Sequence, residues 1–293
     1  MNNKTNQLKI FDLHQDVATS NVALCEYLSN CVAHNLTDLA SLYTSFKPHT
    51  TISAFWTTRS SFDVLDYISN YIKNYPPACD RLFAIEDLWF VDNENVLEKV
   101  CKLPIVYAGL TWNDKNTLAG GANSDVAVGL SDWGKRVVKA LSKSNIVIDT
   151  AHLNEKSFYD VLDLDLGYKK IINSHCCQNA VYKHNRNLSD NQIALIIEHG
   201  GLVGLSPVSF FMKDETDGKS ATVADFAHQI DRFVQTFGCD NLAIGTDFYG
   251  ADPLVGLASY NDFYNLQLQL EKQGYKKIDI AKIFFSNADK FFS

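Results

Sequence analysis

The sequence has no long apolar run and no CxxC cysteine pair. A membrane-spanning helix needs about 18 consecutive apolar residues, and no stretch of the chain offers them. The opening MNNKTNQLKIFDLH has none of the apolar core of a secretory signal, so we expect a cytoplasmic protein with no membrane partner. The seven cysteines are scattered without a CxxC spacing, which argues against a disulfide framework and against a structural zinc knuckle.

The chain also has no excess of basic residues. Lys and Arg total 26 against 34 Asp and Glu, which gives a formal net charge of -8. Nucleic-acid binding depends on clustered basic side chains, so we expect no nucleic-acid partner. The 46% of hydrophobic residues among 293 suffice for a sizeable core. Since no linker, repeat or low-complexity segment interrupts the chain, we expect a single domain over residues 1–293.

Eight short apolar runs alternate with segments of helical spacing. The runs cover residues 8–16, 50–58, 81–89, 104–112, 145–153, 170–177, 201–209 and 241–250. Helical spacing occurs in residues 62–75, 131–143, 155–164, 189–201, 223–238, 257–273 and 278–292. Ser189 is the predicted N-cap of one of these helices, with Gln192 three residues on. Strict alternation indicates a parallel sheet, and eight units predict an α/β fold of the (β/α)8 TIM barrel type, with a doubly wound open sheet as the alternative.

Polar residues stand where these apolar runs end. His14 and Asp16, two residues apart in a predicted strand, point to the same side. Burying both is costly unless they pair with each other or bind a metal, and the sequence of this run leaves both alternatives open. In a barrel the active site lies at the C-terminal ends of the strands. The other residues at such ends are Glu86, Trp112, His152, His175 and Asp247.

Five of these residues offer the nitrogen and oxygen ligands that suit Zn²⁺. They are His14, Asp16, Glu86, His152 and His175. A single histidine at a strand end is commonly a hydrogen-bonded structural residue, so the prediction rests on their joint occurrence. Because five donors exceed the four ligands of a tetrahedral site, they predict two metal ions that share a bridging carboxylate, for which Glu86 is the natural candidate.

In this order, the motifs DLHQD, FAIED, VIDTAHLNEKSFYDVL, INSHCCQNA, NRNLSD and IGTDFYG resemble the membrane dipeptidase (renal dipeptidase) family, peptidase family M19. The resemblance runs from about residue 8 to the end and implies an amidohydrolase-like barrel with two zinc ions. It implies that His14 and Asp16 hold one ion, that His152 and His175 hold the other, and that Glu86 bridges them. A metal-bound hydroxide would then hydrolyse short peptides, which makes the expected enzyme a metallo-dipeptidase.

The resemblance also implies roles for residues beside the metals. Asp247 would take the proton of the nucleophile and pass it to the leaving amine. Arg186 would bind the free C-terminal carboxylate of a dipeptide with its planar guanidinium. Trp112 stands where better-known members have a histidine that hydrogen-bonds the reacting carbonyl oxygen, and Tyr249 departs from the usual DFDG. Relatives are often dimers, so a homodimer is also implied.

Two other functions stay open at this point. One is a different barrel metallohydrolase such as a TatD-like deoxyribonuclease, which typically opens with HxH where this chain has HxD. The other is a non-catalytic metal-binding relative, for which Trp112 and Tyr249 are the only hints. We predict structural roles for the histidines without convergent partners, which are His34, His49, His199 and His228, and leave His184 open because it precedes Arg186 by two residues.

Overall fold

The structure is a computed structural model that describes residues 8–16, 18, 49–56, 63–74, 81–215 and 220–293. Eight parallel strands form a closed barrel in which each pairs with the next along the chain and the last pairs with the first. The strands are β1 (Phe11–Gln15), β2 (Thr50–Phe55), β3 (Arg81–Ile85), β4 (Tyr107–Gly109), β5 (Val147–Asp149), β6 (Ile171–Cys176), β7 (Val203–Leu205) and β8 (Leu242–Ile244). Each lies within one of the predicted runs, so the (β/α)8 barrel is confirmed and the open-sheet alternative is wrong.

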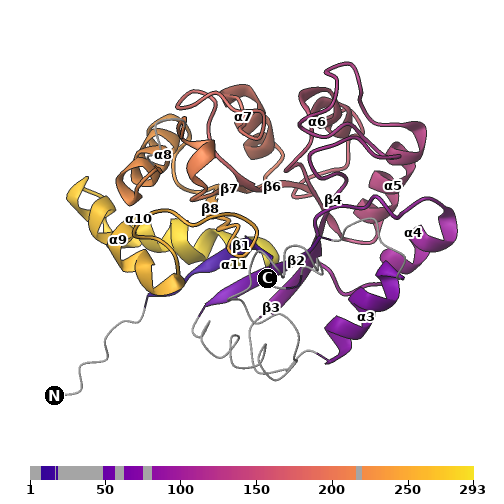
Figure 1. Ribbon diagram of the computed structural model, residues 1–293, viewed down its shortest axis with the longest axis horizontal. Helices are drawn as coiled ribbons and strands as arrows, with labels where there is room; N and C mark the ends of the chain where they lie inside the picture. The colour runs from indigo at the N-terminus through magenta and orange to yellow at the C-terminus, as the bar shows by residue number, and fades with distance from the viewer. Residues whose placement is uncertain (1–7, 17, 19–48, 57–62, 75–80, 216–219) are drawn as a thin grey trace.

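Helices surround this barrel (Figure 1). Within the described residues they are α3 (Val64–Asn74), α4 (Glu94–Val100), α5 (Asp132–Lys143), α6 (Glu155–Leu162), α7 (Asp190–Glu198), α8 (Val223–Phe237), α9 (Phe263–Lys272), α10 (Lys277–Ala281) and α11 (Asn287–Phe292). Helix α4 lies in a stretch where the sequence predicts no helix. The predicted helix over 278–292 is divided by a π-helical segment, Lys282–Ser286, between α10 and α11.

The alternation of residues along the strands produces two layers of core. Ile10 and Phe55 belong to an outer cluster that packs against helix residues such as Phe226. Phe11 and Leu13 belong to a separate cluster inside the barrel. Neighbouring residues at the start of β1 therefore face opposite sides, as expected for a strand buried on both faces.

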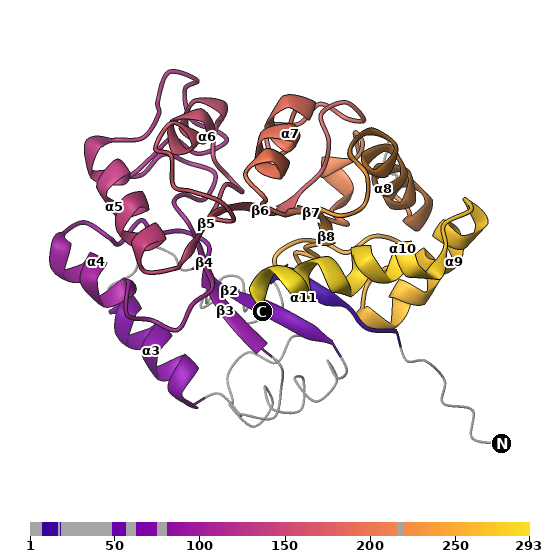
Figure 2. The same ribbon diagram turned by 180° about the vertical axis from the view of Figure 1, so that it is seen from behind.

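The C-terminal segment covers one end of the barrel. Phe285, Phe291 and Phe292 pack against the inner cluster, and the ring of Phe292 stacks on that of Phe11 with centroids 5.9 Å apart. Figure 2 shows α11 lying across the strands at this side. Because Phe11 is the first residue of β1, this is the N-terminal end of the strands. The opposite end, at the C-termini of the strands, is therefore the end where an active site can form.

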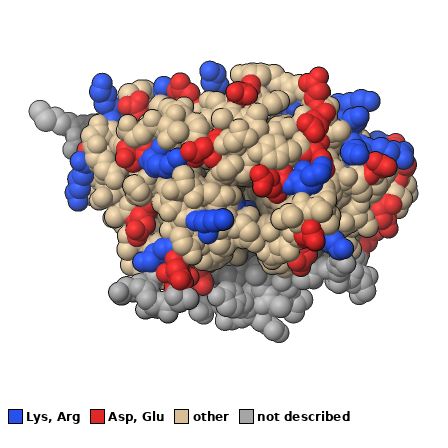
Figure 3. Space-filling model, turned by 90° about the horizontal axis from the view of Figure 1, so that it is seen from above, with Lys and Arg blue, Asp and Glu red and all other residues tan. Residues whose placement is uncertain are grey.

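The charge of the surface and the lengths of the helices are relevant to nucleic-acid and membrane partners. No helix in the described part of the chain is long and apolar enough to cross a bilayer. On the face shown in Figure 3, Lys and Arg are interspersed with Asp and Glu rather than gathered in one field. This face therefore has no extended positive surface of the kind that attracts a polyanion.

Candidate metal centre

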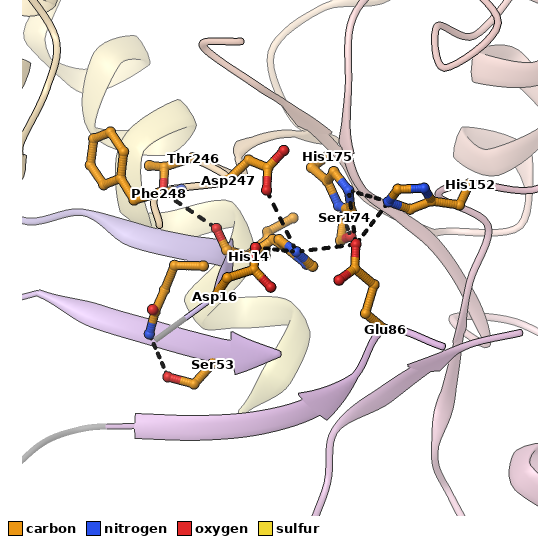
Figure 4. A network of polar contacts seen from close by, with 12 residues as sticks. His14, Asp16, Ser53, Glu86, His152, Ser174, His175, Thr246, Asp247 and Phe248 are labelled. Atoms are coloured by element: carbon orange, nitrogen blue, oxygen red, sulfur yellow. Dashed lines mark hydrogen bonds and ion pairs between the residues drawn. The ribbon is translucent and has the colours of Figure 1, made fainter. Parts of the chain in front are cut away.

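Six of the predicted site residues meet at the C-terminal mouth of the barrel (Figure 4). They lie at or just after the ends of β1, β3, β5, β6 and β8. Parallel strands present their C-terminal ends at the same edge, which brings residues far apart in sequence into one cluster. The six are His14, Asp16, Glu86, His152, His175 and Asp247.

The end of β1 and the loop after β8 are tied together. His14 Nε2 lies 3.5 Å from Asp16 Oδ2, so the two side chains do share one side of the strand end. The Asp247 N–H donates to the His14 carbonyl at 3.0 Å, and buried Asp12 accepts from both the N–H and the hydroxyl of Thr246. This link places Asp247 Oδ1 4.0 Å from His14 Nε2.

Two of the site residues have left-handed backbone conformations. The φ angles of His152 and Asp247 are 65° and 57°, although neither residue is glycine. Such conformations cost of order 1–3 kcal/mol for a non-glycine residue and cluster at functional sites. Here they turn both side chains into the barrel mouth.

Glu86 lies between the three imidazoles. Its Oε1 is 2.8 Å from His152 Nε2, 3.7 Å from His175 Nε2 and 3.8 Å from His14 Nε2. The Nε2 atoms of His152 and His175 are themselves 3.0 Å apart. One carboxylate thus faces all three rings, which is the position that a bridging ligand needs.

The ring orientation of His14 is fixed from inside the barrel. Its Nδ1 lies 2.9 Å from the hydroxyl of buried Tyr107, and that hydroxyl donates to the Leu13 carbonyl at 2.9 Å. Because the hydroxyl proton is already used, the Tyr107 oxygen accepts from the His14 Nδ1–H. The lone pair of His14 is then on Nε2, directed toward Glu86 and Asp16.

The other two rings are held in the same way. His175 Nδ1 lies 2.7 Å from Ser174 Oγ, whose proton goes to the Asp149 carboxylate. His152 Nδ1 lies 2.8 Å from Asn113 Oδ1, an acceptor. All three imidazoles therefore carry the proton on Nδ1 and present Nε2 to the centre, as metal-binding histidines do when an outer hydrogen bond fixes their tautomer.

This arrangement fits a metal ion. Within the described residues, buried His14 Nε2 has no hydrogen-bond partner, and its nearest carboxylate oxygens are 3.5 to 4.0 Å away. Two sets of three ligand atoms lie within 4.8 Å of one another, and both contain His14. One set adds Glu86 and His175, and the other adds Asp16 and Asp247. A buried ligand nitrogen without a hydrogen bond is costly unless a cation binds it.

The carboxylates strengthen this demand for positive charge. Burial, and then the charge of Asp16, raises the pKa of Glu86 well above its ordinary value and that of Asp247 to about 8. Burial alone would lower the pKa of His14, but the carboxylates of Asp16, Glu86 and Asp247 outweigh it and raise that pKa to about 10. In the absence of metal, protons are therefore the cations that this site attracts.

His152 and His175 behave in the opposite way. Burial, followed by nearby positive charge, lowers the pKa of each well below the ordinary value for histidine. Both are therefore neutral at neutral pH. A neutral imidazole is the form that binds a metal.

Comparison with known proteins identifies the family. Residues 79–293 match the family model described as membrane dipeptidase (peptidase family M19). The chain belongs to the membrane dipeptidase family. It is 26% identical over 213 residues to dipeptidase tcpJ of Claviceps purpurea, covering 71% of this chain and 49% of that protein. It is also 26% identical over 172 residues to an uncharacterized dipeptidase of Schizosaccharomyces pombe, covering 57% of this chain and 41% of that protein.

The chain spans about half the length or less of these two curated relatives. A solved structure covers more. The metallo peptidase from Rhodobacter sphaeroides, liganded with a phosphinate mimic of the dipeptide L-Ala-D-Ala, superposes with a TM-score of 0.76 over 97% of this chain and 98% of that one. At 19% identity this likeness establishes the fold.

In this dipeptidase-family barrel, Arg186 reaches into the metal centre itself. The residue is buried, and one guanidinium nitrogen lies 2.6 Å from His175 Nε2. The guanidinium also lies over the ring of Phe211, with its carbon 5.3 Å from the ring centroid. A guanidinium is always charged, so it supplies part of the positive charge that the carboxylates attract.

A cavity of about 180 Å³ opens beside the metal centre. Trp112, 38% exposed, forms part of its wall. Its ring lies 5.0 Å from that of Trp56 and 6.1 Å from that of His152. The neighbouring Asn113, rather than Trp112, makes the hydrogen bond to His152. Tyr249, the other departure from the family pattern, has a φ of 70° in the loop after β8.

Several residues that support the metal ligands are not predicted from the sequence. Ser174 directly precedes a candidate ligand, so its position was a usable signal. Tyr107 and Asp149 lie within strands whose sequence shows only burial, and their contacts with the site depend on barrel closure. Gly250 is needed for space, because a Cβ at this residue would overlap Asp16 Oδ2 and lie 2.5 Å from Asp247 Oδ1.

The remaining histidines contact other parts of the fold. His49 accepts a hydrogen bond from a backbone N–H ahead of β1, and burial lowers its pKa to about 4. His199 caps α7 and contacts a carbonyl of that helix, and His228 is exposed on α8. His184 accepts the backbone N–H two residues on, which shapes the loop that carries the cavity arginine. His34 lies outside the described residues.

Proposed function

We propose that this chain is a metal-dependent dipeptidase that hydrolyses dipeptides with a free C-terminal carboxylate. His14 and Asp16 would hold one zinc ion, His152 and His175 the other, and Glu86 would bridge them. The observation that carries the proposal is the convergence of three Nε2 atoms within 2.8 to 3.8 Å of one Glu86 oxygen. Bound zinc lowers the pKa of water and polarises a carbonyl. Family membership favours this function over a nuclease.

Asp247 is positioned to move the proton. Its side chain lines the cavity and is 13% exposed, so water and the amine of a substrate can both reach it. It would accept the proton of the attacking water and donate it to the leaving amine, since a general base and acid must lie within hydrogen-bond reach of both.

Arg186 would bind the substrate carboxylate. It lines the cavity and carries a planar pair of donors that matches a carboxylate. A nitrogen that binds a cation cannot also accept from a guanidinium, so we expect Arg186 to leave His175 when metal is bound. The free N–H donors of Arg186 would then face the cavity. They would bind a C-terminal carboxylate next to the scissile bond, which favours dipeptides over longer chains.

The test combines metal analysis with a panel of dipeptides. Zinc-loaded protein should release free amino acids from dipeptides with a free C-terminus and act poorly on their C-terminally amidated forms. Glu86→Ala should lose both bound zinc and activity because the bridge serves both ions. Glu98→Ala, a change at an exposed residue of α4, should retain both.

Three outcomes would contradict parts of this proposal. A fully active preparation without a transition metal would exclude the metal centre. Equal cleavage of free and amidated dipeptides would exclude the role of Arg186. Stoichiometric zinc without hydrolysis of any dipeptide would instead support the non-catalytic relative.

A further inference from the structure

Two pairs of aromatic side chains form the walls of the cavity. Trp56 follows β2 and Trp112 follows β4, and their rings lie 5.0 Å apart at 48°. Phe210 and Phe211 belong to a 3₁₀ turn after β7, and their rings are 4.8 Å apart at 80°. Both pairs line the cavity that opens beside the metal centre. Aromatic rings from three separate segments thus converge on one small space.

Two of these four rings are exposed, whereas Phe211 is buried in the core. Trp112 is 38% exposed and Phe210 is 43% exposed, although both residues are large and apolar. Apolar surface gathered at a cavity commonly marks a binding site, whereas single exposed residues are ordinary. The carboxyl groups of Asp16, Glu86 and Asp247 line the same cavity. Polar groups beside aromatic walls suit a substrate with a polar backbone and an apolar side chain.

The Phe pair contacts Arg186, the residue expected to bind the substrate carboxylate. The Arg186 guanidinium lies over the Phe211 ring, an arrangement in which the ring face attracts the cation. The Trp pair lies beside a candidate metal ligand, because the Trp112 ring is 6.1 Å from that of His152. Each aromatic pair therefore contacts or approaches a different residue of the reaction centre.

We propose that these aromatic walls form a side-chain subsite that selects dipeptides carrying phenylalanine, tyrosine or tryptophan. The inference rests on the proposed dipeptidase function and specifies its substrate class. Aromatic rings prefer edge-to-face or offset contacts at centroid distances of about 4.5–7 Å, and an aromatic substrate side chain can make such contacts here. Trp112 stands where the family resemblance places a histidine, so this part of the subsite departs from the family pattern.

The selectivity is measured as a ratio of kcat/KM values. Zinc-loaded protein is assayed on Ala-Ala, Phe-Ala and Ala-Phe, and on the counterparts in which cyclohexylalanine replaces phenylalanine. At least one phenylalanine dipeptide should exceed Ala-Ala about tenfold or more, the scale on which apolar pockets discriminate. Phenylalanine should also exceed cyclohexylalanine, which has the same carbon skeleton without an aromatic face. The two positions of phenylalanine show which residue of the substrate enters the subsite.

Substitutions of the aromatic residues test whether they cause the preference for phenylalanine dipeptides. Trp112→Leu and Trp56→Leu should bring the ratio close to one, mainly through KM, while zinc content and circular dichroism stay unchanged. Trp112→Phe keeps a ring and should retain most of the preference. Tyr264→Leu removes an exposed aromatic residue of α9 that does not line the cavity, and it should leave the ratio unchanged.

The failures of the two proposals are distinguishable. Hydrolysis of Ala-Ala with no aromatic preference, or equal rates for phenylalanine and cyclohexylalanine, would overturn the subsite and leave the dipeptidase standing. Calorimetric Kd values for Phe-Ala, Ala-Phe and Ala-Ala on the zinc-loaded Asp247→Asn variant report binding without turnover. Selective binding of a phenylalanine dipeptide by a protein that hydrolyses nothing would support the subsite and overturn the function. Equal Kd values for all three would overturn the subsite whatever the activity.

Discussion

Hydrogen bonds from residues outside the candidate ligand set decide which ring nitrogen of each histidine faces the metal centre. Tyr107 is the clearest case, because its hydroxyl accepts from His14 Nδ1 and donates to the Leu13 carbonyl. Tyr107→Phe should lower zinc affinity about 10–100-fold, the usual effect of losing such a partner. It should also reduce the free energy of unfolding by about 1–3 kcal/mol, since polar groups are left unpaired in the interior. Chelator competition and denaturant unfolding measure the two effects.

The matched control for this change is Tyr264→Phe. Tyr264 is 58% exposed on α9, so removing its hydroxyl should alter neither quantity. If Tyr107→Phe binds zinc as tightly as the unchanged protein, the hydrogen bond does not fix the tautomer of His14.

A glycine controls the space between two carboxylates. A Cβ at position 250 would overlap Asp16 Oδ2 and crowd Asp247 Oδ1. We expect Gly250→Ala to displace both carboxylates and therefore to lower zinc stoichiometry and dipeptide hydrolysis, with the circular dichroism spectrum of the barrel unchanged. Elemental analysis of the purified variant checks this, and normal zinc content with normal activity would show that the loop moves to accept the methyl group.

The clustering of the candidate ligands was predictable because their residue types and their places after apolar runs could be read directly. The residues that hydrogen-bond these histidines could not be predicted. Tyr107 and His14, for example, are 93 residues apart and meet only inside a closed barrel. The same holds for Arg186. The family resemblance implied a carboxylate-binding role, which stays a prediction, and the contact of Arg186 with His175 Nε2 depends on how the loop after β6 folds back.

At the scale of elements, helix α7 begins where the sequence predicts. Ser189 accepts from the backbone N–H of Gln192, and the Gln192 side chain accepts from the backbone N–H of Ser189. Ser189→Ala should lower the free energy of unfolding by about 1 kcal/mol, because one orphan N–H loses its acceptor. The midpoint of urea unfolding measures the change. Ser189→Thr keeps the cap and should restore most of the loss, whereas equal destabilisation by both variants would show that the cap contributes nothing.

The elements that the sequence did not predict have physical reasons. Helix α4 is seven residues long, too short for a helical period to stand out, although Asn93 caps it. The last helix is continuous in its apolar spacing, but the π-helical turn at Lys282–Ser286 divides it. This segment and α11 supply Phe285 and Phe292 to the end of the barrel, where they pack against Phe11. The spacing of apolar residues within this segment cannot predict a contact with a residue at the other end of the chain.

At the scale of the whole molecule, closing the barrel concentrates charge at one end. Asp247 ionises near its ordinary pKa of 3.8 when unfolded, but in the folded, metal-free chain burial and Asp16 raise its pKa to about 8. Between those values folding takes up a proton, so the stability of the metal-free protein falls as pH rises. The slope from one such group is up to about 1.4 kcal/mol per pH unit. His14 acts in the same direction from pH 6.5 upward, because its folded pKa is about 10.

Zinc should reverse this dependence, because the ion takes the place of the protons. His152 and His175 have lowered pKa values, so their protonation opposes folding and zinc binding only below their ordinary pKa of 6.5. From pH 6.5 to 8, the interval between that value and the folded pKa of Asp247, the metal-free protein should therefore become less stable. A ligand that binds only the folded chain stabilises it more as its affinity rises, and metal affinity rises as competing protons leave.

The final prediction is that zinc raises the free energy of unfolding more at pH 8 than at pH 6.5, the two ends of that interval. Denaturant unfolding of zinc-loaded and chelator-treated protein at both pH values measures the difference. Asp247→Asn cannot take up the proton, so the metal-free variant should lose stability less steeply over this range. Equal stability of the unchanged metal-free protein at both pH values would mean that the carboxylates at the barrel mouth do not hold protons.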